Sequence, residues 1–562
     1  RLVVGAVVAA VGVAGVAPEV QRVPERASPL PQLPLLRAVG GELSTSLQLR
    51  PVRLEGPVLS MTTRALNGSV PGPALAIYPG SRLRVRFENL LETPSGPHLR
   101  NNYHYPNRSN LHTHGLHVAP QKPGDDVLTT VVDPGQMWQY EYRLIPDHSP
   151  GTYWIHAHAH GSAVLQTGAG VALPLLVLDP PGFLSPQLAA MQDTVLMLQA
   201  LPKANLEAAA KTAGDRLLKI DHWNAGPELW LVNGAPEPVL ETKAGEWRRL
   251  RLIGAGVGSW LNLHFGACDV ALLAKDGVYI QDFPRFVPRV AVPPGGRADV
   301  VVRCAVGRHR VESLEGAATG AKAFKGLVLE ISAAGAGGGE ELRPWAPATR
   351  PRYLQDLRAA QPDCACSTSM GLGGNTRWME GHLWEGAERY LHRSPQDAVV
   401  ERRLSGVAKH PYHAHNYPYQ LVSSPNVSDN YFKAGDWHDT YLNAEDPHAT
   451  VRFQTVDVSG PQVVHCHFLG HSDRGMIAVE MVNGSGPSAC GCDLLDAAER
   501  QPSLPAALAS APEPVLFVGL AVGLFAAMLG MVVAWGARTA RAWREDCYRS
   551  LDGGPATGGR VQ

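Results

Sequence analysis

The feature that most constrains this chain is a set of histidines spaced two residues apart. With 22 His in 562 residues, about one His-x-His triplet is expected by chance. On a strand, side chains two apart project from the same face, so each triplet directs two imidazoles to one side. Imidazole binds copper, iron and zinc, and the pattern therefore predicts a metal protein built on strands. The chain contains five such triplets: His112/His114, His156/His158, His158/His160, His413/His415 and His465/His467.

Composition and local patterning also favour strands. Gly (58) and Pro (46) are abundant, and turns lead into segments of alternating polar and apolar residues at 79–87, 244–252 and 447–453. A similar strand is expected at 294–302. The separation of these segments predicts three β-sandwich domains of ordinary size, at 41–182, 190–335 and 345–492. Charge is balanced, with 50 Lys+Arg against 51 Asp+Glu, so nothing suggests nucleic acid as a partner.

Two apolar segments lie at the ends of the sequence. Residues 1–17 resemble the hydrophobic part of a secretory signal, although an uncleaved anchor is an alternative. Residues 515–535 carry no charge and are long enough for a single transmembrane helix. Arginines follow directly, which predicts a cytoplasmic tail at 536–562 and places the preceding residues outside the cytosol. Residues 493–514, rich in Pro and Ala, are expected to form a stalk to this membrane helix.

The cysteines agree with an exported chain. Six of the eight Cys are free for disulfides, because Cys547 falls in the predicted tail and Cys466 lies among histidines. We expect one disulfide within the second domain and a pairing of two Cys-x-Cys motifs, whose connectivity the sequence leaves open; metal binding by these motifs is the alternative. The candidates are Cys268 with Cys304, and Cys364 and Cys366 with Cys490 and Cys492. Candidate N-glycosylation sites are Asn67, Asn107, Asn426 and Asn483.

The run from His465 to Met476 identifies the metal. Cys466 stands between two His, so on a strand its thiolate faces one side while His465 and His467 face the other. One metal can then take the thiolate while others take the flanking imidazoles. His410, Cys466 and His471 with a weak axial Met476 form the arrangement of a blue-copper site. A closed tetrahedral zinc site has little use for a thioether and is the less favoured alternative.

With these motifs, the chain resembles a multicopper oxidase of the laccase and ferroxidase superfamily. The resemblance extends over about residues 41–490, and four copper motifs occur in the order that the family shows. The residue sequence of these motifs, as in Asn110-Leu-His-Thr-His-Gly-Leu-His-Val118, is similar to that of bacterial-type members. The resemblance implies cupredoxin-like Greek-key β-sandwiches and an enzyme that couples one-electron oxidation of a reductant to four-electron reduction of dioxygen to water.

The resemblance also implies four copper ions per chain with distinct ligand sets. His410, Cys466 and His471, with Met476 axial, would hold the type 1 copper, and His112 and His413 the type 2 copper. His471 would receive the electron from the reductant. His117 and His160 are surplus to this pattern and are interpreted as supporting or core residues. The type 3 pair would be held by His114, His156, His158, His415, His465 and His467.

Three aspects of function stay open at this point. Many bacterial members carry Glu directly after the last type 1 His, but this chain has Ser472 and then Asp473. We therefore expect Asp125 or Asp126 to be the acid near the copper cluster and name Asp126 as the candidate catalytic residue, although turn formation would also explain the pair. The reductant is either a phenolic compound or Fe²⁺ or Mn²⁺. A membrane-anchored ferroxidase beside an iron permease, a one-copper electron-transfer cupredoxin and a non-catalytic copper-binding surface protein are the alternatives.

Overall fold

The computed structural model of the chain describes residues 18–92, 100–202, 228–316, 320–335, 337–373, 376–423, 425, 429–484 and 489–492. The predicted signal segment 1–17, stalk 493–514, membrane helix 515–535 and tail 536–562 lie outside these residues, as does Asn426. Among the residues described, we find no helix that combines the length and the apolar character needed to cross a membrane.

The regular secondary structure of the described part of the chain is almost entirely β-strand, which confirms the all-β prediction. The helices found there are one turn or little more: α1 (Ala163–Thr167), α2 (Pro186–Ala189), α4 (Leu469–Ser472) and the 3₁₀-helix η1 (Arg352–Leu354). The strands form three pairs of sheets that follow one another along the sequence, within 19–177, 192–334 and 364–492.

The first pair of sheets comes from the amino-terminal third of the chain. One sheet has the order β1-β3-β6-β8 with β4 on β3, and the other has the order β2-β5-β10-β9-β7. Strands β1 and β2 precede residue 41, where the first domain was predicted to begin, and pair with β3 and β5 of these sheets. The bounds are β1 (Glu19–Arg22), β2 (Leu35–Arg37), β3 (Glu42–Glu55), β4 (Ser60–Leu66), β5 (Ala74–Ile77), β6 (Arg82–Asn89), β7 (His112–His114), β8 (Met137–Arg143), β9 (Gly151–His156) and β10 (Ala172–Val177).

The second pair of sheets follows β10. Its larger sheet has the order β13-β12-β11-β15-β21-β17-β18 with β19 on β17, and its smaller sheet has the order β14-β23-β22-β16-β20. The bounds are β11 (Gln192–Pro202), β12 (Glu228–Val232), β13 (Ala235–Pro236), β14 (Val239–Lys243), β15 (Arg248–Ala255), β16 (Leu261–His264), β17 (Asp269–Lys275), β18 (Val278–Tyr279), β19 (Arg285–Phe286), β20 (Val290–Val292), β21 (Arg297–Arg303), β22 (Gly307–Ser313) and β23 (Gly326–Ala334).

The third pair of sheets carries the His-Cys-His run. Its sheets have the orders β25-β24-β27-β32-β29-β30 and β31-β28-β33-β34-β26-β35. The bounds are β24 (Cys364–Gly373), β25 (Thr376–Met379), β26 (Tyr390–Pro395), β27 (Val399–Ser405), β28 (Tyr412–Ala414), β29 (Tyr419–Leu421), β30 (Trp437–His438), β31 (Thr440–Tyr441), β32 (His448–Gln454), β33 (Gly460–Cys466), β34 (Ile477–Asn483) and β35 (Gly491–Cys492).

The alternating pattern gives the expected half-buried strand in β6. Leu83, Val85 and Phe87 are buried in the first core, while the arginines between them face outward and form ion pairs. Strand β3 pairs with β6 in parallel, and β8 pairs with it antiparallel.

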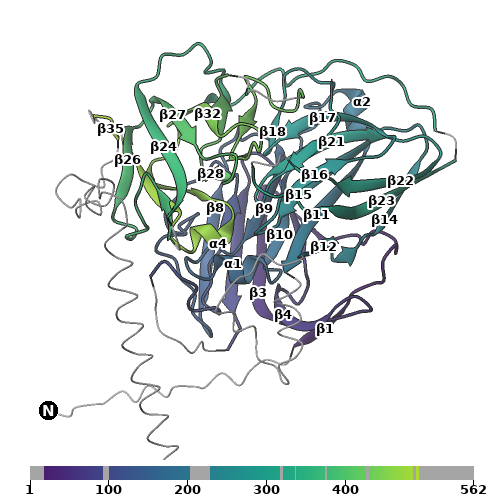
Figure 1. The fold of residues 1–562 in the computed structure, drawn as a ribbon, viewed down its shortest axis with the longest axis horizontal. Coiled ribbons are helices and arrows are strands. Elements are labelled where there is room, and N and C mark those ends of the chain that lie inside the picture. The colour runs from purple at the N-terminus through teal and green to yellow at the C-terminus, as the bar shows by residue number, and fades with distance from the viewer. Residues whose placement is uncertain are drawn as a thin grey trace, which may run out of the picture. The chain divides into compact units, whose positions relative to one another are not determined.

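Strand β15 differs from the expected half-buried strand, because all of its side chains are buried. Its second face packs against the first pair of sheets, where it contacts β9 (Figure 1). Arg249 donates to Asp299 at 2.5 Å, and Arg251 donates to Asp193 at 2.8 Å. Because both arginines are buried and paired with carboxylates, a strand with an alternating sequence can be covered on both faces.

Three disulfides join the predicted cysteines. Cys268 is bonded to Cys304, Cys364 to Cys490 and Cys366 to Cys492. The two parallel bridges attach β35 to β24, so the Cys-x-Cys motifs form disulfides rather than a metal site.

The predicted sequons differ in exposure. Asn67 is exposed, and Asn483 is partly exposed. Asn107 is buried, its amide nitrogen donates to the carbonyl of Glu92, and its oxygen accepts from Arg64. A glycan on this nitrogen has no space in the folded chain, so Asn107 is not a favoured site.

Candidate metal centre

The histidine triplets come together because short strands of the first and third domains carry them. His112 pairs with His156 across β7 and β9, and His413 pairs with His465 across β28 and β33. The rings of the two domains interleave: His112 stacks on His415 with centroids 3.7 Å apart, and His114 stacks on His413 at 3.8 Å. The eight rings of this imidazole cluster are all buried: His112, His114, His156, His158, His413, His415, His465 and His467.

The inward nitrogens of the cluster are spaced for shared metal ions. His112 Nε2 and His413 Nε2 lie 3.4 Å apart, and His158 Nε2 and His465 Nε2 lie 3.1 Å apart. Because a metal–imidazole bond is about 2.0 Å long, two nitrogens at such a separation are able to reach one ion. Three groups of ligand atoms in this cluster lie within 4.8 Å of one another: His112/His114/His156, His112/His413/His415 and His158/His415/His465.

Several of these nitrogens are buried without a hydrogen-bond partner in the described part of the chain. They are His114 Nδ1, His156 Nε2, His415 Nε2 and both ring nitrogens of His467. Buried polar atoms are normally satisfied, so a group of orphaned imidazole nitrogens within one cluster fits a set of metal ions.

Burial keeps these imidazoles neutral, which is the form that binds metal. It lowers the pKa of His465 to about 3, and neighbouring rings lower the pKa values of the others further. The rings whose pKa is lowered are His114, His156, His158, His413, His415, His465 and His467.

Hydrogen bonds on the outer nitrogens fix how the rings are turned. His112 Nδ1 donates to Asp125 at 2.8 Å, and His413 Nδ1 donates to the carbonyl of Asp439 at 2.8 Å. His114 is turned the other way, because its Nε2 lies 3.1 Å from the Asp439 carboxylate and its Nδ1 is the orphaned atom. Such outer contacts set the tautomer and therefore the nitrogen offered to a metal.

The predicted thiolate site lies on the other side of β33. Cys466 Sγ is 3.7 Å from His410 Nδ1 and 3.6 Å from His471 Nδ1, and the two nitrogens are 3.2 Å apart. Met476 is fully buried, and its carbonyl accepts from the Cys466 N–H. Burial raises the pKa of the Cys466 thiol well above its usual range, so ionisation of this sulfur requires a bound cation.

The thiolate site and the imidazole cluster are joined by neighbouring residues. His465 and His467 flank Cys466 and belong to the imidazole cluster. In addition, His465 Nδ1 donates to the carbonyl of Cys466 at 3.0 Å. A few covalent bonds and one hydrogen bond therefore link the two sites.

The acidic residues named from the sequence have different positions. Asp125 accepts from His112 Nδ1 and from the backbone and hydroxyl of Thr113. Asp126, the candidate catalytic acid, instead accepts from the backbone of Leu128 and Thr129, as a turn residue does. Of this pair, the geometry favours Asp125 at the cluster.

Asp473 is held in place by hydrogen bonds from backbone N–H groups. It is buried, and its two oxygens accept from the N–H groups of Gly161 and Val164 at the start of α1. Burial raises the pKa of this carboxyl to about 7, against the opposing effect of these backbone hydrogen bonds. Asp473 therefore connects α4 to α1, which lie in contact (Figure 1).

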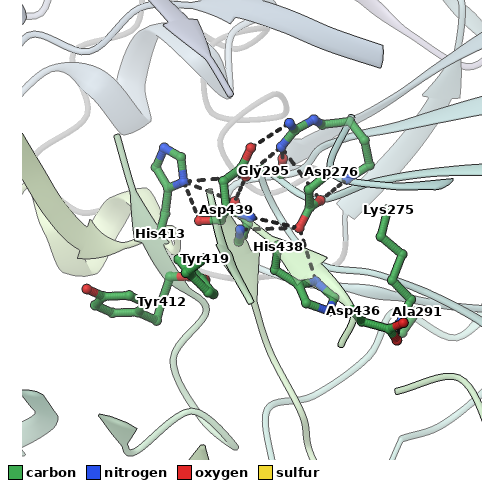
Figure 2. Close-up of polar contacts among 12 residues, drawn as sticks. Lys275, Asp276, Ala291, Gly295, Tyr412, His413, Tyr419, Asp436, His438 and Asp439 are labelled. Carbon is green, nitrogen blue, oxygen red and sulfur yellow. Dashed lines mark hydrogen bonds and ion pairs between the residues drawn. The ribbon is translucent and has the colours of Figure 1, made fainter. Parts of the chain in front are cut away.

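The second domain adds an ionic network behind the cluster that no pattern in the sequence indicates. Arg297, on β21, donates to both oxygens of Asp439 at 2.6 Å, and Asp439 contacts His114. Asp276 accepts from the Arg297 backbone at 2.8 Å and from His438 at 3.2 Å. Figure 2 shows Asp439 beside His413 and Asp276 beside His438.

The backbone of the second domain also reaches the cluster. A Cβ placed on Gly295 would lie 2.7 Å from Cδ2 of His467, and Gly295 has a φ of +85°. Only glycine fits this close approach. Thus the second domain encloses the metal site although it provides none of the predicted ligands.

The surplus histidine His117 has a structural environment. Its Nδ1 donates to the Asn416 carbonyl at 2.7 Å, its Nε2 lies 3.2 Å from the Asp457 carboxylate, and its ring stacks on Tyr353 with centroids 4.0 Å apart. His160 lies beside Trp384, with ring centroids 5.7 Å apart.

Two segments, residues 54–182 and 361–485, match models of the family described as multicopper oxidase. The chain is 24% identical to copper resistance protein A of Pseudomonas syringae pv. tomato over 337 residues, which are 52% of this chain and 51% of that protein. It is 25% identical to laccase-4 of Thanatephorus cucumeris over 274 residues, 46% of each chain. The chain thus spans about half the length of these curated relatives.

Solved structures show the same fold. A multicopper oxidase from Campylobacter jejuni, described as a metallo-oxidase, superposes with a TM-score of 0.65 at 19% identity, over 82% of this chain and 96% of that one. A laccase from Pediococcus acidilactici superposes with a TM-score of 0.64 at 20% identity, over 83% and 96% of the two chains.

Proposed function

We propose that the chain is a multicopper oxidase that couples the one-electron oxidation of a reductant to the reduction of dioxygen to water. The observation that carries this proposal is the junction at Cys466. Cys466 belongs to the thiolate site, and its neighbours His465 and His467 belong to the buried cluster of eight imidazoles. Three consecutive residues therefore connect the two sites. A path of this kind suits electron transfer between two metal sites.

Four copper ions per chain fit the donor atoms. In this assignment His410, Cys466, His471 and Met476 hold the type 1 ion, and His112 and His413 the type 2 ion. Bound copper would accept single electrons at the thiolate site and deliver four of them to dioxygen at the imidazole cluster. The type 3 pair is assigned to His114, His156, His158, His415, His465 and His467.

The protein residues have separate tasks in this scheme. The buried imidazole cluster excludes bulk water, and its outer hydrogen bonds hold each ring in one orientation. His471 is the partly exposed ligand of the thiolate site, so it is the residue that a reductant reaches. Asp125 holds the proton on His112 Nδ1, and the Cys466 carbonyl accepts from His465.

The alternative functions use less of this arrangement. A one-copper electron-transfer protein would need only the thiolate site, and a non-catalytic surface protein would have no need for eight buried imidazoles. The site therefore favours the oxidase.

We also propose that the described residues work outside the cytosol. Three disulfides support this location, because such bonds persist in oxidising compartments. The transmembrane helix at 515–535 and the cytoplasmic tail belong to the same proposal on the basis of sequence alone.

The test is oxygen uptake by the copper-loaded full chain, together with its copper content. We expect four copper ions per chain and a blue absorption band. Cys466→Ser should lose both the band and turnover with unchanged circular dichroism, whereas His413→Ala should keep the band and lose turnover. One copper per chain, zinc alone, or retained turnover in Cys466→Ser would refute the proposal.

A further inference from the structure

A cavity of about 260 Å³ lies where segments of the three domains meet, and none of the predicted copper ligands lines it. Its wall comes from residues within 146–150 of the first domain, 278–279 of the second and 347–354 of the segment that precedes β24. Ligand pockets are frequent at domain junctions and typically measure about 300–1,000 Å³. The cavity is therefore large enough for a small molecule, and its wall indicates which kind.

The wall of this cavity is mostly apolar. Six prolines line it, together with Phe183 and Tyr279, whose ring centroids lie 5.6 Å apart. Phe183 is partly exposed, so part of its ring is available to a ligand. Flat proline and aromatic faces suit a planar aromatic ring, because such rings pack against aromatic neighbours in offset or edge-on geometry.

Most polar atoms of the wall already have partners. His148 is buried, its Nδ1 donates to the Ser149 carbonyl at 2.9 Å, and its Nε2 accepts from the His117 N–H at 3.0 Å. Burial lowers the pKa of His148 to about 3, so its ring is neutral. Asp147 and Arg350 are the charged side chains of the described wall.

Arg350 is a cation without a carboxylate in ion-pair contact among the described residues. Its Nη2 donates to the Tyr279 carbonyl at 2.7 Å, and the Gln281 amide, turned with its oxygen toward the guanidinium, accepts from Nε and Nη2. Both acceptors are neutral. Burial lowers the pKa of Arg350 to about 10, against the smaller opposing effects of Asp356 and Asp436. A partly buried guanidinium with neutral partners is stabilised by a bound anion.

Arg350 and Pro347 also line a second cavity, which is polar and measures about 530 Å³. The other cations that line it already have carboxylates as partners. These ion pairs are Arg285–Asp436, Arg358–Asp356 and Lys433–Asp282. Of the cations described in the two walls, Arg350 is thus the one whose charge is left for a ligand.

We propose that the apolar cavity binds a small aromatic carboxylate, with its ring among the prolines and Phe183 and its carboxylate on Arg350. The planar guanidinium offers parallel N–H groups that match the two oxygens of a carboxylate. Asp147 repels such an anion, but it is exposed, so water and salt screen its charge more than that of the partly buried Arg350. Because no predicted copper ligand lines the cavity, the inference does not depend on the proposed oxidase function.

The experiment is a calorimetric titration of the copper-loaded full chain with three compounds. Benzoate has both the ring and the charge, benzyl alcohol has the ring alone, and acetate has the charge alone. We expect benzoate to bind about 10-fold or more tightly than either of the others, because only benzoate uses both parts of the wall. The copper absorption spectrum, recorded during the titration, should stay unchanged.

Variants identify the residues responsible. Arg350→Gln should weaken benzoate binding about 10- to 100-fold, and Arg350→Lys should weaken it less, because the charge stays while the paired N–H groups are lost. Asp147→Asn should strengthen binding about 2- to 5-fold, since it removes a repelling charge. Arg352→Gln is the matched control, because this exposed arginine pairs with Asp397 at 2.8 Å and lines neither cavity. Circular dichroism shows whether each variant folds.

Several outcomes would overturn the inference. They are an absence of benzoate binding, equal affinity for benzoate in Arg350→Gln and the unaltered chain, and acetate or benzyl alcohol binding as tightly as benzoate. A benzoate-dependent change in the copper spectrum would overturn it too, because the anion would then lie on the copper ions. If Arg350→Gln does not fold, Asp147→Asn decides, and an unchanged affinity in that variant counts against the site. Failure of the chain to consume oxygen would affect the proposed function alone.

Discussion

At the scale of single residues, Asp125 has the most specific role around the imidazole cluster. Its Oδ2 accepts from His112 Nδ1, and its Oδ1 accepts from the Thr113 backbone and hydroxyl. The carboxylate thus fixes both the ring orientation and the backbone of β7. Hydrogen bonds of this kind increase the basicity of the opposite nitrogen and hold it toward the metal.

Asp125→Asn is therefore expected to weaken copper binding at His112. A neutral amide is a poorer acceptor for the ring N–H, and loss of such a contact typically lowers metal affinity or activity about 10- to 100-fold. Copper content per chain, copper spectra and oxygen uptake measure the effect. Asp126→Asn is the matched control, because Asp126 bonds to Leu128 and Thr129 and should change activity little. The reverse result would restore Asp126 as the acid at the cluster.

At the scale of elements, part of the architecture was accessible from the sequence and part was not. The His-x-His spacing matches the two-residue period of a strand, so the triplets on β7 and at the end of β28 were recognisable without a structure. The contact between Arg297 and Asp439 joins residues 142 positions apart, and no local pattern marks such a pair. Strands β1 and β2 were missed for a different reason, because they are short and mostly exposed.

Arg297→Met tests how strand β21 supports the imidazole cluster. It would leave the buried Asp439 carboxylate unpaired beside His114, and breaking a buried ion pair typically costs about 3–5 kcal/mol of stability. Burial already raises the pKa of Asp439 to about 6 against the effect of Arg297, so the variant should raise that pKa further. Denaturant unfolding and copper content check both effects.

Two further variants make this result specific. Arg303 lies on the same strand, but Arg303→Met removes exposed ion pairs with Asp269 and Glu341. Its loss of folding stability should therefore stay below about 1 kcal/mol. The double variant Arg297→Met/Asp439→Asn should recover part of the stability, since no buried charge is left alone. A loss of stability in Arg297→Met no larger than in Arg303→Met would contradict the role of the buried pair.

At the scale of the whole molecule, the metal centre concentrates groups that oppose folding in acid. The rings of His114, His413 and His415 are buried and neutral, and burial lowers their pKa values well below that of an unfolded chain. Lowered values also occur at the thiolate site, where the pKa is about 4 for His410 and about 3 for His471. Below pH 6.5 the unfolded chain therefore binds more protons than the folded one, so stability is lost as pH falls from there toward the folded pKa values.

The copper-free chain should consequently lose stability steeply between about pH 6.5 and pH 4, because each such ring contributes about 1.4 kcal/mol per pH unit. Bound copper would occupy the same nitrogens, and protons would have to displace it before charging the rings. Unfolding by denaturant at several pH values, with and without copper and with the disulfides intact, measures the difference. Parallel pH profiles for the two forms would mean that copper does not occupy these imidazoles, because ligation and protonation compete for the same lone pairs.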